Sequence, residues 1–169
     1  MSINNILTPS IALSRPFVLA EIKKIEELEQ TVDRGFKVAG LGLLVKTVES
    51  MELLDKPKIF PLPKVHRYCL GLVSLRGVIF PLFDFRKEIM ATKAPLRWVL
   101  VFNNGLKTAA FVIDELPIQL LPEEIESLDS IPDMPAFLAP FILSGLSVNK
   151  KDFYFELDAY GLLDSIKNH

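Results

Sequence analysis

The chain has 169 residues, which suits one domain or at most two small ones. Half of the residues are apolar and 24% are charged, a balance that can build a hydrophobic core and is not typical of a disordered chain. Nineteen basic and 21 acidic side chains give a net charge of −2, which argues against a mainly electrostatic grip on nucleic acid or an anionic membrane.

Cysteine and histidine are too scarce for the sites that they usually form. Cys69 is the single cysteine, so an internal disulfide is excluded and a reducing compartment is favoured. The two histidines, His66 and His169, leave too few soft ligands for a tetrahedral zinc site. We therefore expect no metal site.

No stretch of the sequence predicts a transmembrane helix. The longest uncharged run, residues 134–149, has 16 residues and contains two prolines, whereas a span needs roughly 20 apolar residues. Residues 1–14 carry no charge but lack the basic start and compact apolar block of a signal peptide. We therefore expect a cytoplasmic protein.

Residues 1–34 predict an arm followed by an amphipathic helix. Ser14 can cap a helix whose first turn holds Pro16, because a proline loses no hydrogen bond there. From Phe17 onward, apolar residues recur at helical spacing with charged residues between them, and Gly35 marks the end. Such a helix packs on its own domain or binds a partner, and the sequence leaves both open.

After this helix the pattern changes to short apolar runs separated by proline, glycine and polar residues, which favours strands. We expect strands at residues 36–39, 41–51, 58–62, 70–75, 78–83, 97–102, 107–114, 118–121, 141–148 and 152–157. Asn104-Gly105 predicts a two-residue hairpin turn with positive φ at both positions, and Asn149-Lys150 a second, weaker one. This number of short strands suggests a sandwich or small barrels, followed by a helix at 158–167.

The sequence offers poor candidates for catalysis. Gly40-Leu-Gly42 lacks the third glycine of a phosphate-binding loop, and a bend between strands explains it better. His66 and Cys69 could form a nucleophilic pair, but a half-exposed histidine beside a buried thiol is the simpler interpretation. Three acidic residues follow a proline in an expected loop and should face solvent: Glu123, Glu124 and Glu126. We therefore expect a binding protein and not an enzyme.

The stretch from Tyr68 to Arg86 is the most informative part of the chain. Two apolar strands are joined at Arg76-Gly77, so the arginine stands at a strand end beside a glycine that permits a tight turn. There it can present its planar guanidinium at the rim of an apolar groove, or it can be an ordinary solvated turn residue.

This stretch resembles the central signature of CheW-family adaptor domains, which is roughly G-V-x-N-L-R-G-x-x-x-P-V-x-D-L-R. The matching positions are Gly71, Leu72, Leu75, Arg76, Gly77, Pro81, Asp84, Phe85 and Arg86, with Ser74 in place of the usual asparagine and phenylalanine in place of leucine at 85. The similarity covers about residues 35–165. Within the family the chain looks most similar to the PilI type, the adaptor of pilus-linked chemosensory systems, through its N-terminal helix and residues 137–145.

The resemblance implies a mainly β fold: two intertwined, five-stranded SH3-like barrels around a shared core, over residues 35–169, with a short C-terminal helix. It implies no catalytic activity and no cofactor. Family members couple the cytoplasmic tip of a methyl-accepting chemoreceptor, a helical hairpin, to the regulatory domain of a CheA-type histidine kinase. They meet the membrane only through receptor arrays. The output would be type IV pilus twitching for a PilI-type adaptor, or flagellar bias for a flagellar CheW.

The resemblance also implies a set of receptor-binding residues. They are Arg76, Leu75, Gly77, Val48, Glu52 and Leu53. Arg76 matches the signature arginine beside the receptor groove, whereas ordinary core packing explains Val48 and Leu53 equally well.

Two residues are weaker candidates for kinase contact. These are Ile59 and Gly145, and a strand bend accounts for Gly145 as well. The alternative of a different class is a small-barrel domain that binds nucleic acid, which the net charge of −2 disfavours.

Overall fold

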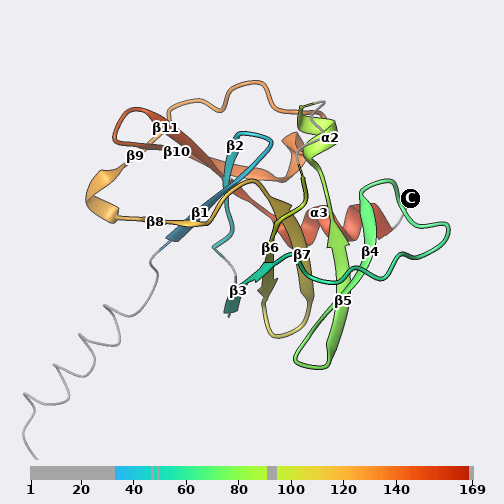
Figure 1. The fold of residues 1–169 in the computed structure, drawn as a ribbon. Helices are drawn as coiled ribbons and strands as arrows, with labels where there is room; N and C mark the ends of the chain where they lie inside the picture. Colours follow the sequence, from blue (N-terminus) through green and yellow to red (C-terminus); the bar gives the residue numbers. More distant parts are fainter. Residues whose placement is uncertain (1–32, 47, 49, 91–94, 168–169) are drawn as a thin grey trace, which may run out of the picture. The chain divides into compact units, whose positions relative to one another are not determined.

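The computed structural model describes residues 33–46, 48, 50–90 and 95–167, and most of its regular structure is β-strand (Figure 1). Of the arm and helix expected over residues 1–34, residues 1–32 lie outside the described part of the chain. Asp33 and Arg34, expected at the end of that helix, instead begin the first strand together with Gly35, because they pair with a neighbouring strand. The described residues belong to one compact unit that begins at Asp33, so their two sheets can be placed relative to each other.

The first sheet has six strands in the order β8-β1-β2-β11-β10-β9. Their bounds are β1 Asp33–Val38, β2 Leu41–Leu44, β8 Ile118–Leu120, β9 Ile125–Ser127, β10 Ile142–Val148 and β11 Asp152–Leu157. The edge strands β8 and β9 follow each other in the chain and are joined through the short 3-10 helix η2, Pro122–Glu124. Because this connection is too short to cross an open six-stranded sheet, the sheet is curled, and we call it the first barrel.

The second sheet has five strands in the order β3-β6-β7-β5-β4, and we call it the second barrel. Their bounds are β3 Ser50–Asp55, β4 Cys69–Leu75, β5 Val78–Phe83, β6 Trp98–Asn103 and β7 Thr108–Ile113. The short helix α2, Arg86–Ile89, follows β5. The chain thus enters the first barrel, completes the second, and returns to the first, so that the two are intertwined.

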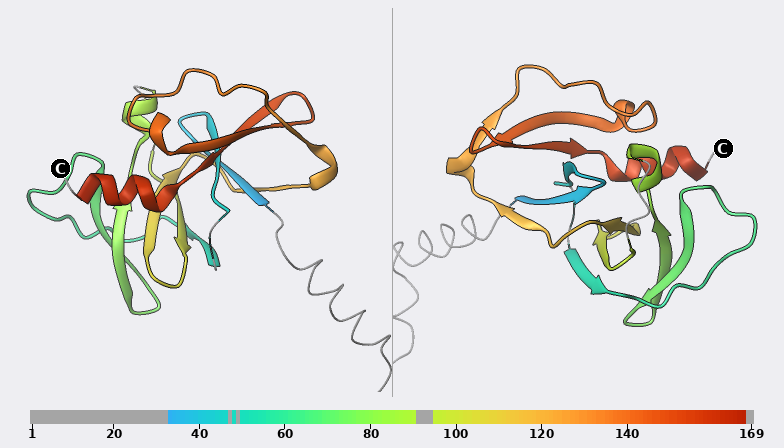
Figure 2. Two further views of the ribbon diagram at one scale, coloured as in Figure 1. Left: turned by 180° about the vertical axis from the view of Figure 1, so that it is seen from behind. Right: turned by 45° about the horizontal axis from the view of Figure 1, so that its top comes forward.

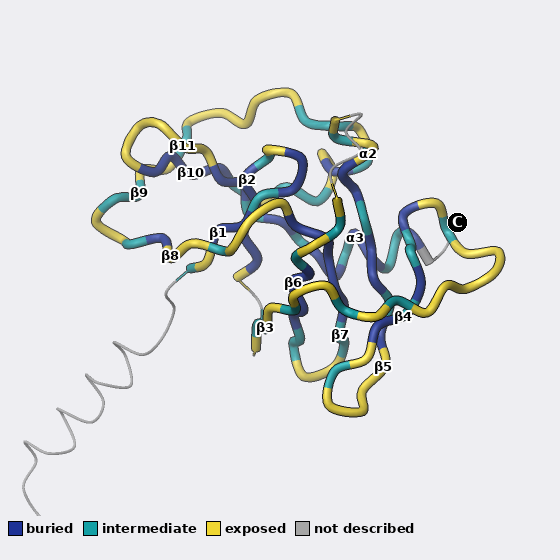
Figure 3. Tube along the Cα trace, viewed as in Figure 1, coloured by how far each residue is buried: buried dark blue, intermediate teal, exposed yellow. Residues whose placement is uncertain are grey.

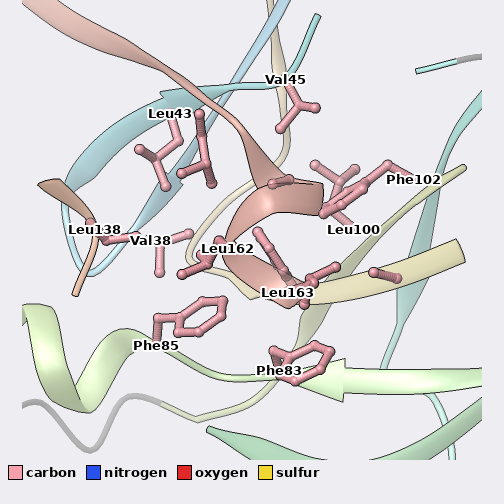
Figure 4. Close-up of a cluster of buried hydrophobic side chains, with 14 of the residues drawn as sticks. Val38, Leu43, Val45, Phe83, Phe85, Leu100, Phe102, Leu138, Leu162 and Leu163 are labelled. Carbon is pink, nitrogen blue, oxygen red and sulfur yellow. The ribbon is translucent and has the colours of Figure 1, made fainter. Parts of the chain in front are cut away.

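Three apolar clusters hold this arrangement together. One is enclosed by the first barrel and includes Leu120 and Tyr154, and one is enclosed by the second barrel and includes Val73. The largest lies between the barrels and contains residues of both sheets and of the C-terminal helix α3, Ala159–Lys167. Figure 2 shows α3 where the two sheets meet, and Figure 4 shows its Leu162 and Leu163 among side chains of both. This shared cluster couples the two barrels, because separating them would expose its apolar side chains to water.

The predicted mainly β fold is confirmed, but several details of the prediction are wrong. The strand expected at 41–51 is two strands in different barrels, because the chain crosses between them after Leu44. The strand expected at 58–62 is reduced to a single bridge between Phe60 and Leu72, since prolines at 57, 61 and 63 cannot donate to a ladder. The first barrel has six strands instead of five, because the three-residue β8 and β9 each pair at an edge.

The two hairpin turns expected from sequence both form, but their geometries are exchanged. Asn149 and Lys150 have φ of 52° and 57°, and the N–H of Lys151 donates to the carbonyl of Val148 at 3.1 Å. This is the positive-φ turn that had been expected at Asn104-Gly105. That loop is longer, because the Asn104 side chain accepts hydrogen bonds from the backbone N–H groups of Leu106 and Lys107, and of the two expected turn residues only Gly105 has positive φ.

None of the helices in the described part of the chain is long and apolar enough to cross a membrane. The C-terminal helix expected at 158–167 is confirmed as α3. A further short 3-10 helix, η3 at Ala139–Phe141, precedes β10.

Candidate partner-binding site

The turn between β4 and β5 holds Arg76 at the tip of a hairpin. Leu75 pairs with Val78, so Arg76 and Gly77 are the two turn residues, with φ of 51° and 83°. Positive φ at both positions is typical of a type I′ turn, which matches the twist of a hairpin. A left-handed backbone conformation is unfavourable by about 1–2 kcal/mol for a residue with a side chain. The conformation of Arg76 therefore carries backbone strain that the rest of the hairpin offsets. Residues 76–79 are exposed, as Figure 3 shows at the turn before β5.

Arg76 reaches across to the edge strand β3 and forms an ion pair with Glu52. Its two terminal nitrogens lie 3.2 Å and 2.8 Å from the two carboxylate oxygens, which is a bidentate arrangement. The Arg76 side chain is 78% exposed and that of Glu52 is 32% exposed. An ion pair this exposed contributes about 0.2–1 kcal/mol to stability, so its main effect is to fix where the guanidinium points.

Both residues of this ion pair line a cavity of about 200 Å³, which we call the barrel-mouth cavity. Its lining residues come from β3 to β7 and are Ser50, Glu52, Leu75, Arg76, Val78, Phe80, Val101, Asn103 and Thr108. Val78 is 55% exposed at its entrance. The cavity is therefore an apolar recess with the Arg76–Glu52 pair at its rim.

A second cavity, of about 350 Å³, lies between the two barrels, and we call it the inter-barrel groove. The second barrel contributes Met51, Glu52, Leu53 and Leu100, and the first barrel with its approach contributes Arg34, Leu116, Pro117 and Gln119. Leu53 and Leu116 are 38% and 51% exposed, so apolar surface stands open on both walls. Glu52 lines both cavities and thereby connects the groove to the Arg76 turn.

Most of the residues expected to bind a receptor come together here. Leu75, Arg76 and Glu52 line the barrel-mouth cavity, and Glu52 and Leu53 line the inter-barrel groove. Val48 is different, because it is half-buried and packs against the shared core, in line with the core-packing interpretation. Gly77 adjoins Arg76, and a side chain there would meet open space, so its φ of 83° is what calls for glycine.

The residues expected to contact a kinase lie in different barrels. Ile59 is half-buried against the core of the second barrel. Gly145 is buried in β10, where an added Cβ would lie 2.9 Å from the Leu128 side chain and 3.3 Å from the Phe155 ring. Packing of this kind explains a glycine at 145 without any partner.

Sequence reasoning missed one whole wall of the groove. This wall comes from the first barrel, where β1 and β8 are distant in sequence but pair with each other, with Arg34 opposite Gln119. Its residues line the groove together with residues of β3; they are Arg34, Leu116, Pro117 and Gln119. Residue spacing carries no signal of such a meeting. The one local signal is the apolar Leu116-Pro117 pair at the end of a strand, where polar turn residues are the rule.

The signature residues Asp84 and Arg86 have a structural role. Asp84 accepts a hydrogen bond from the backbone N–H of Arg86 at 3.0 Å and two from its guanidinium at 2.9 Å. The side chains are only 9% and 6% exposed. Hydrogen bonding to Asp84 holds the pKa of Arg86 above its usual value, against the effect of burial. This buried pair fixes the turn into α2, where Arg86 also donates to the Pro95 carbonyl.

His66 and Cys69 are joined by a backbone hydrogen bond, from the Cys69 N–H to the His66 carbonyl at 2.8 Å, but their side chains contact other groups. The Cys69 thiol, expected to be buried, belongs to a half-buried residue. The His66 ring packs against Tyr68 with 4.8 Å between ring centroids, and the Cys69 thiol lies 3.6 Å from the Gly71 carbonyl. Tyr68 is buried in a cluster with Phe85 and Phe137. Within the described residues, no group of three or more His, Cys, Asp or Glu side chains is placed to hold a metal ion.

Comparison with known families decides what kind of domain this is. A sequence model described as the CheW-like domain matches residues 35–166. The chain belongs to the CheW-like domain family.

A solved CheW-like relative shares the fold. The crystal structure of scaffolding protein TtCheW from Thermoanaerobacter tengcongensis matches with a TM-score of 0.58 and 16% sequence identity. The match covers 77% of this chain and 90% of that chain. At this identity the likeness concerns the fold of this CheW-like domain. A search of curated proteins found no match.

Proposed function

We propose that this CheW-like protein is a non-catalytic adaptor of a bacterial chemosensory system. It would couple the cytoplasmic tip of a methyl-accepting chemoreceptor to the regulatory domain of a CheA-type histidine kinase. Membership in the CheW-like family supports the adaptor role. The observation that carries the proposal for this chain is the inter-barrel groove, which has exposed apolar residues on both walls and is lined by Glu52, the ion-pair partner of Arg76.

The groove suits a helix as its occupant. An amphipathic helix buries an apolar stripe of residues at i, i+3, i+4 and i+7 in a groove of this kind, and polar groups at the rim fix its register. Leu53 and Leu116 supply apolar contact from opposite walls. Arg76, whose charge is balanced by Glu52, supplies a planar donor for carbonyl oxygens of the helix. Leu75, Gly77 and Glu52 would hold Arg76 in place, while Val48 would act from the core behind β3.

Kinase binding needs a surface separate from the receptor groove, because an adaptor must hold both partners together. We place this surface on the outer parts of the barrels. Ile59 beside the second barrel stays our candidate contact. The buried Gly145 would act through the shape of β10 and not by direct contact.

The adaptor would work by differential affinity. A receptor can shift the kinase between active and inactive states only if the adaptor complex binds one receptor conformation more tightly than the other. No covalent step is involved. The size of the shift depends on the difference between the free energies with which the complex binds the two receptor conformations. Every 1.4 kcal/mol of that difference changes the equilibrium between the two conformations about tenfold.

The output of the system would be type IV pilus twitching, as for PilI-type adaptors. Similarity of the N-terminal segment and of residues 137–145 to that type supports this assignment. Deletion of the gene should then abolish twitching and leave swimming intact. Loss of swimming with normal twitching would assign the protein to flagellar chemotaxis.

The receptor role is tested by calorimetric titration with soluble fragments of the chemoreceptor tips encoded in the same genome. Leu53→Asp places a charge in the groove and should abolish binding. Leu143→Asp is the matched control, because Leu143 is 62% exposed in β10 of the first barrel and does not line the groove. Equal binding by both variants, with both folded, would contradict the groove as the receptor site.

A further inference from the structure

Arg34 stands out among the arginines of the described residues. Four others have acidic partners: Arg67 pairs with Glu88, Arg76 with Glu52, Arg86 with Asp84 and Arg97 with Asp55. Arg34 is exposed on β1 and forms no ion pair with any residue that the structure describes. It is also the one arginine besides Arg76 that lines either of the two cavities described above.

The charge of the groove follows from this difference. Its described lining contains two charged residues, Arg34 and Glu52. The carboxylate of Glu52 is neutralised by Arg76 at 2.8 Å and 3.2 Å. The groove therefore presents an uncompensated positive charge on the wall formed by the first barrel, next to the exposed apolar surface of Leu116.

We propose that Arg34 is a specificity-determining residue that recognises a carboxylate beside the apolar stripe of the helix bound in the groove. This inference rests on the proposed function and names the partner's chemistry in more detail. The partner helix carries Asp or Glu on the flank that faces the first barrel, within reach of the planar guanidinium fork. A helix with Lys or Arg at that position is rejected, because like charges meet as the groove is desolvated.

The position of the charge also fixes the direction of the helix. Arg34 lies on the wall of the first barrel, whereas the Arg76–Glu52 pair belongs to the second barrel. A helix turned end for end would present its acidic flank to the second barrel, away from Arg34. One unpaired arginine thus selects both the partner's sequence and its orientation, while the apolar walls provide most of the affinity.

The test uses the full chain and a soluble chemoreceptor-tip fragment from the same genome that binds the wild type. Arg34→Glu should weaken binding about tenfold or more, because it replaces attraction to the partner carboxylate by repulsion. Arg34→Lys keeps the positive charge and should weaken binding by no more than about threefold. Arg97→Glu is the matched control, because it changes the net charge equally at an exposed arginine outside the groove. It should leave binding unchanged, and urea unfolding should show that each variant is folded.

Rescue identifies the contact itself. Each acidic residue flanking the apolar stripe of the fragment is changed to Lys in turn, and one such fragment should bind Arg34→Glu more tightly than it binds the wild type. Wild-type affinity in Arg34→Glu, or weakening that no single reversal rescues, would overturn the role of Arg34. If Leu53→Asp still abolished binding, the proposed function would stand. If Leu53→Asp also bound normally, or no fragment bound the wild type, the receptor role would fail together with the inference.

Discussion

The guanidinium of Arg76 and the carboxylate of Glu52 form a two-point ion pair between residues 24 positions apart, at 2.8 Å and 3.2 Å. The pair ties the tip of the β4–β5 hairpin to the edge strand β3, and so relates the two edges of the second barrel. Both side chains keep contact with solvent, so the pair adds little to stability. Its consequence is to orient a donor beside two apolar cavities before any partner arrives.

Removal of the Arg76 side chain should separate binding from stability. In Arg76→Ala, the free energy of unfolding should fall by less than about 1 kcal/mol, because the lost ion pair is exposed. Affinity for a receptor-tip fragment should fall about tenfold or more. Urea unfolding and calorimetric titration measure the two quantities, and Arg97→Ala, which breaks the exposed pair with Asp55, is the control. An unfolded Arg76→Ala protein would contradict a recognition role.

The buried Arg86–Asp84 pair should behave in the opposite way. Arg86→Met leaves the Asp84 carboxylate, only 9% exposed, without its ionic partner. Leaving a buried charge uncompensated costs about 3–5 kcal/mol, which is a large part of the stability of a small domain. Urea unfolding should show this loss, whereas Arg97→Met should stay within about 1 kcal/mol. A small loss in Arg86→Met would mean that Asp84 finds water or another donor.

Two glycines should respond differently to alanine. An added Cβ at Gly42 would overlap the backbone carbonyl oxygen of Phe153 in the neighbouring strand, so Gly42→Ala must separate β2 from β11. At Gly77 a Cβ meets open space, and the cost is the left-handed φ of 83°, about 1–2 kcal/mol. Thermal unfolding should therefore show a much larger loss for Gly42→Ala. Equal losses would contradict the parallel pairing of β2 and β11.

Acid stability should depend on Glu156. Burial alone would raise the pKa of Glu156, but hydrogen bonds from Lys46 at 2.9 Å and Ser144 at 2.8 Å lower the pKa below its ordinary value. The unfolded chain then takes up the proton at a higher pH than the folded chain. The stabilisation is therefore complete above the unfolded pKa and is lost as the pH falls through the folded pKa.

Replacement of this carboxyl checks the sign of the effect. The free energy of unfolding of Glu156→Gln should fall less than that of the wild type between about pH 7 and about pH 3. Ser144→Ala should show an intermediate loss, because one of the two hydrogen bonds remains. An identical acid dependence in wild type and Glu156→Gln would show that the folded pKa of Glu156 is not lowered.

Local sequence was sufficient where strands are bounded by turn residues. The strands Val78–Phe83 and Asp152–Leu157 have the limits predicted, because glycine or polar residues precede each apolar run. The break after Leu44 was missed, since residues 45–49 contain no proline or glycine and the apolar pattern runs on through Val45 and Val48. At this point the chain passes from the first barrel to the second, and residues of the crossing pack on the shared core. The cause is tertiary packing, and the local sequence carries no signal of it.

The candidate site was half predictable for the same reason. Arg76 and Leu75 belong to one hairpin, so the sequence signature places them together. Glu52 and Leu53 were expected through the family resemblance, but the sequence did not predict the ion pair of Glu52 with Arg76. Arg34 and Leu116 enter the site only where the two barrels meet. The turn at Arg76 could therefore be expected from residue spacing, whereas the groove beside it required the fold.

The most direct test of the adaptor account is a calorimetric titration of the regulatory domain of a CheA-type kinase from the same genome into this protein saturated with a receptor-tip fragment. Saturable one-to-one binding, with an affinity that changes when the receptor fragment is present, is the predicted result, because the two sites are separate and coupled. Failure of every such kinase domain to bind, with or without the receptor fragment, would contradict an adaptor role and leave the CheW-like fold without the function proposed for it.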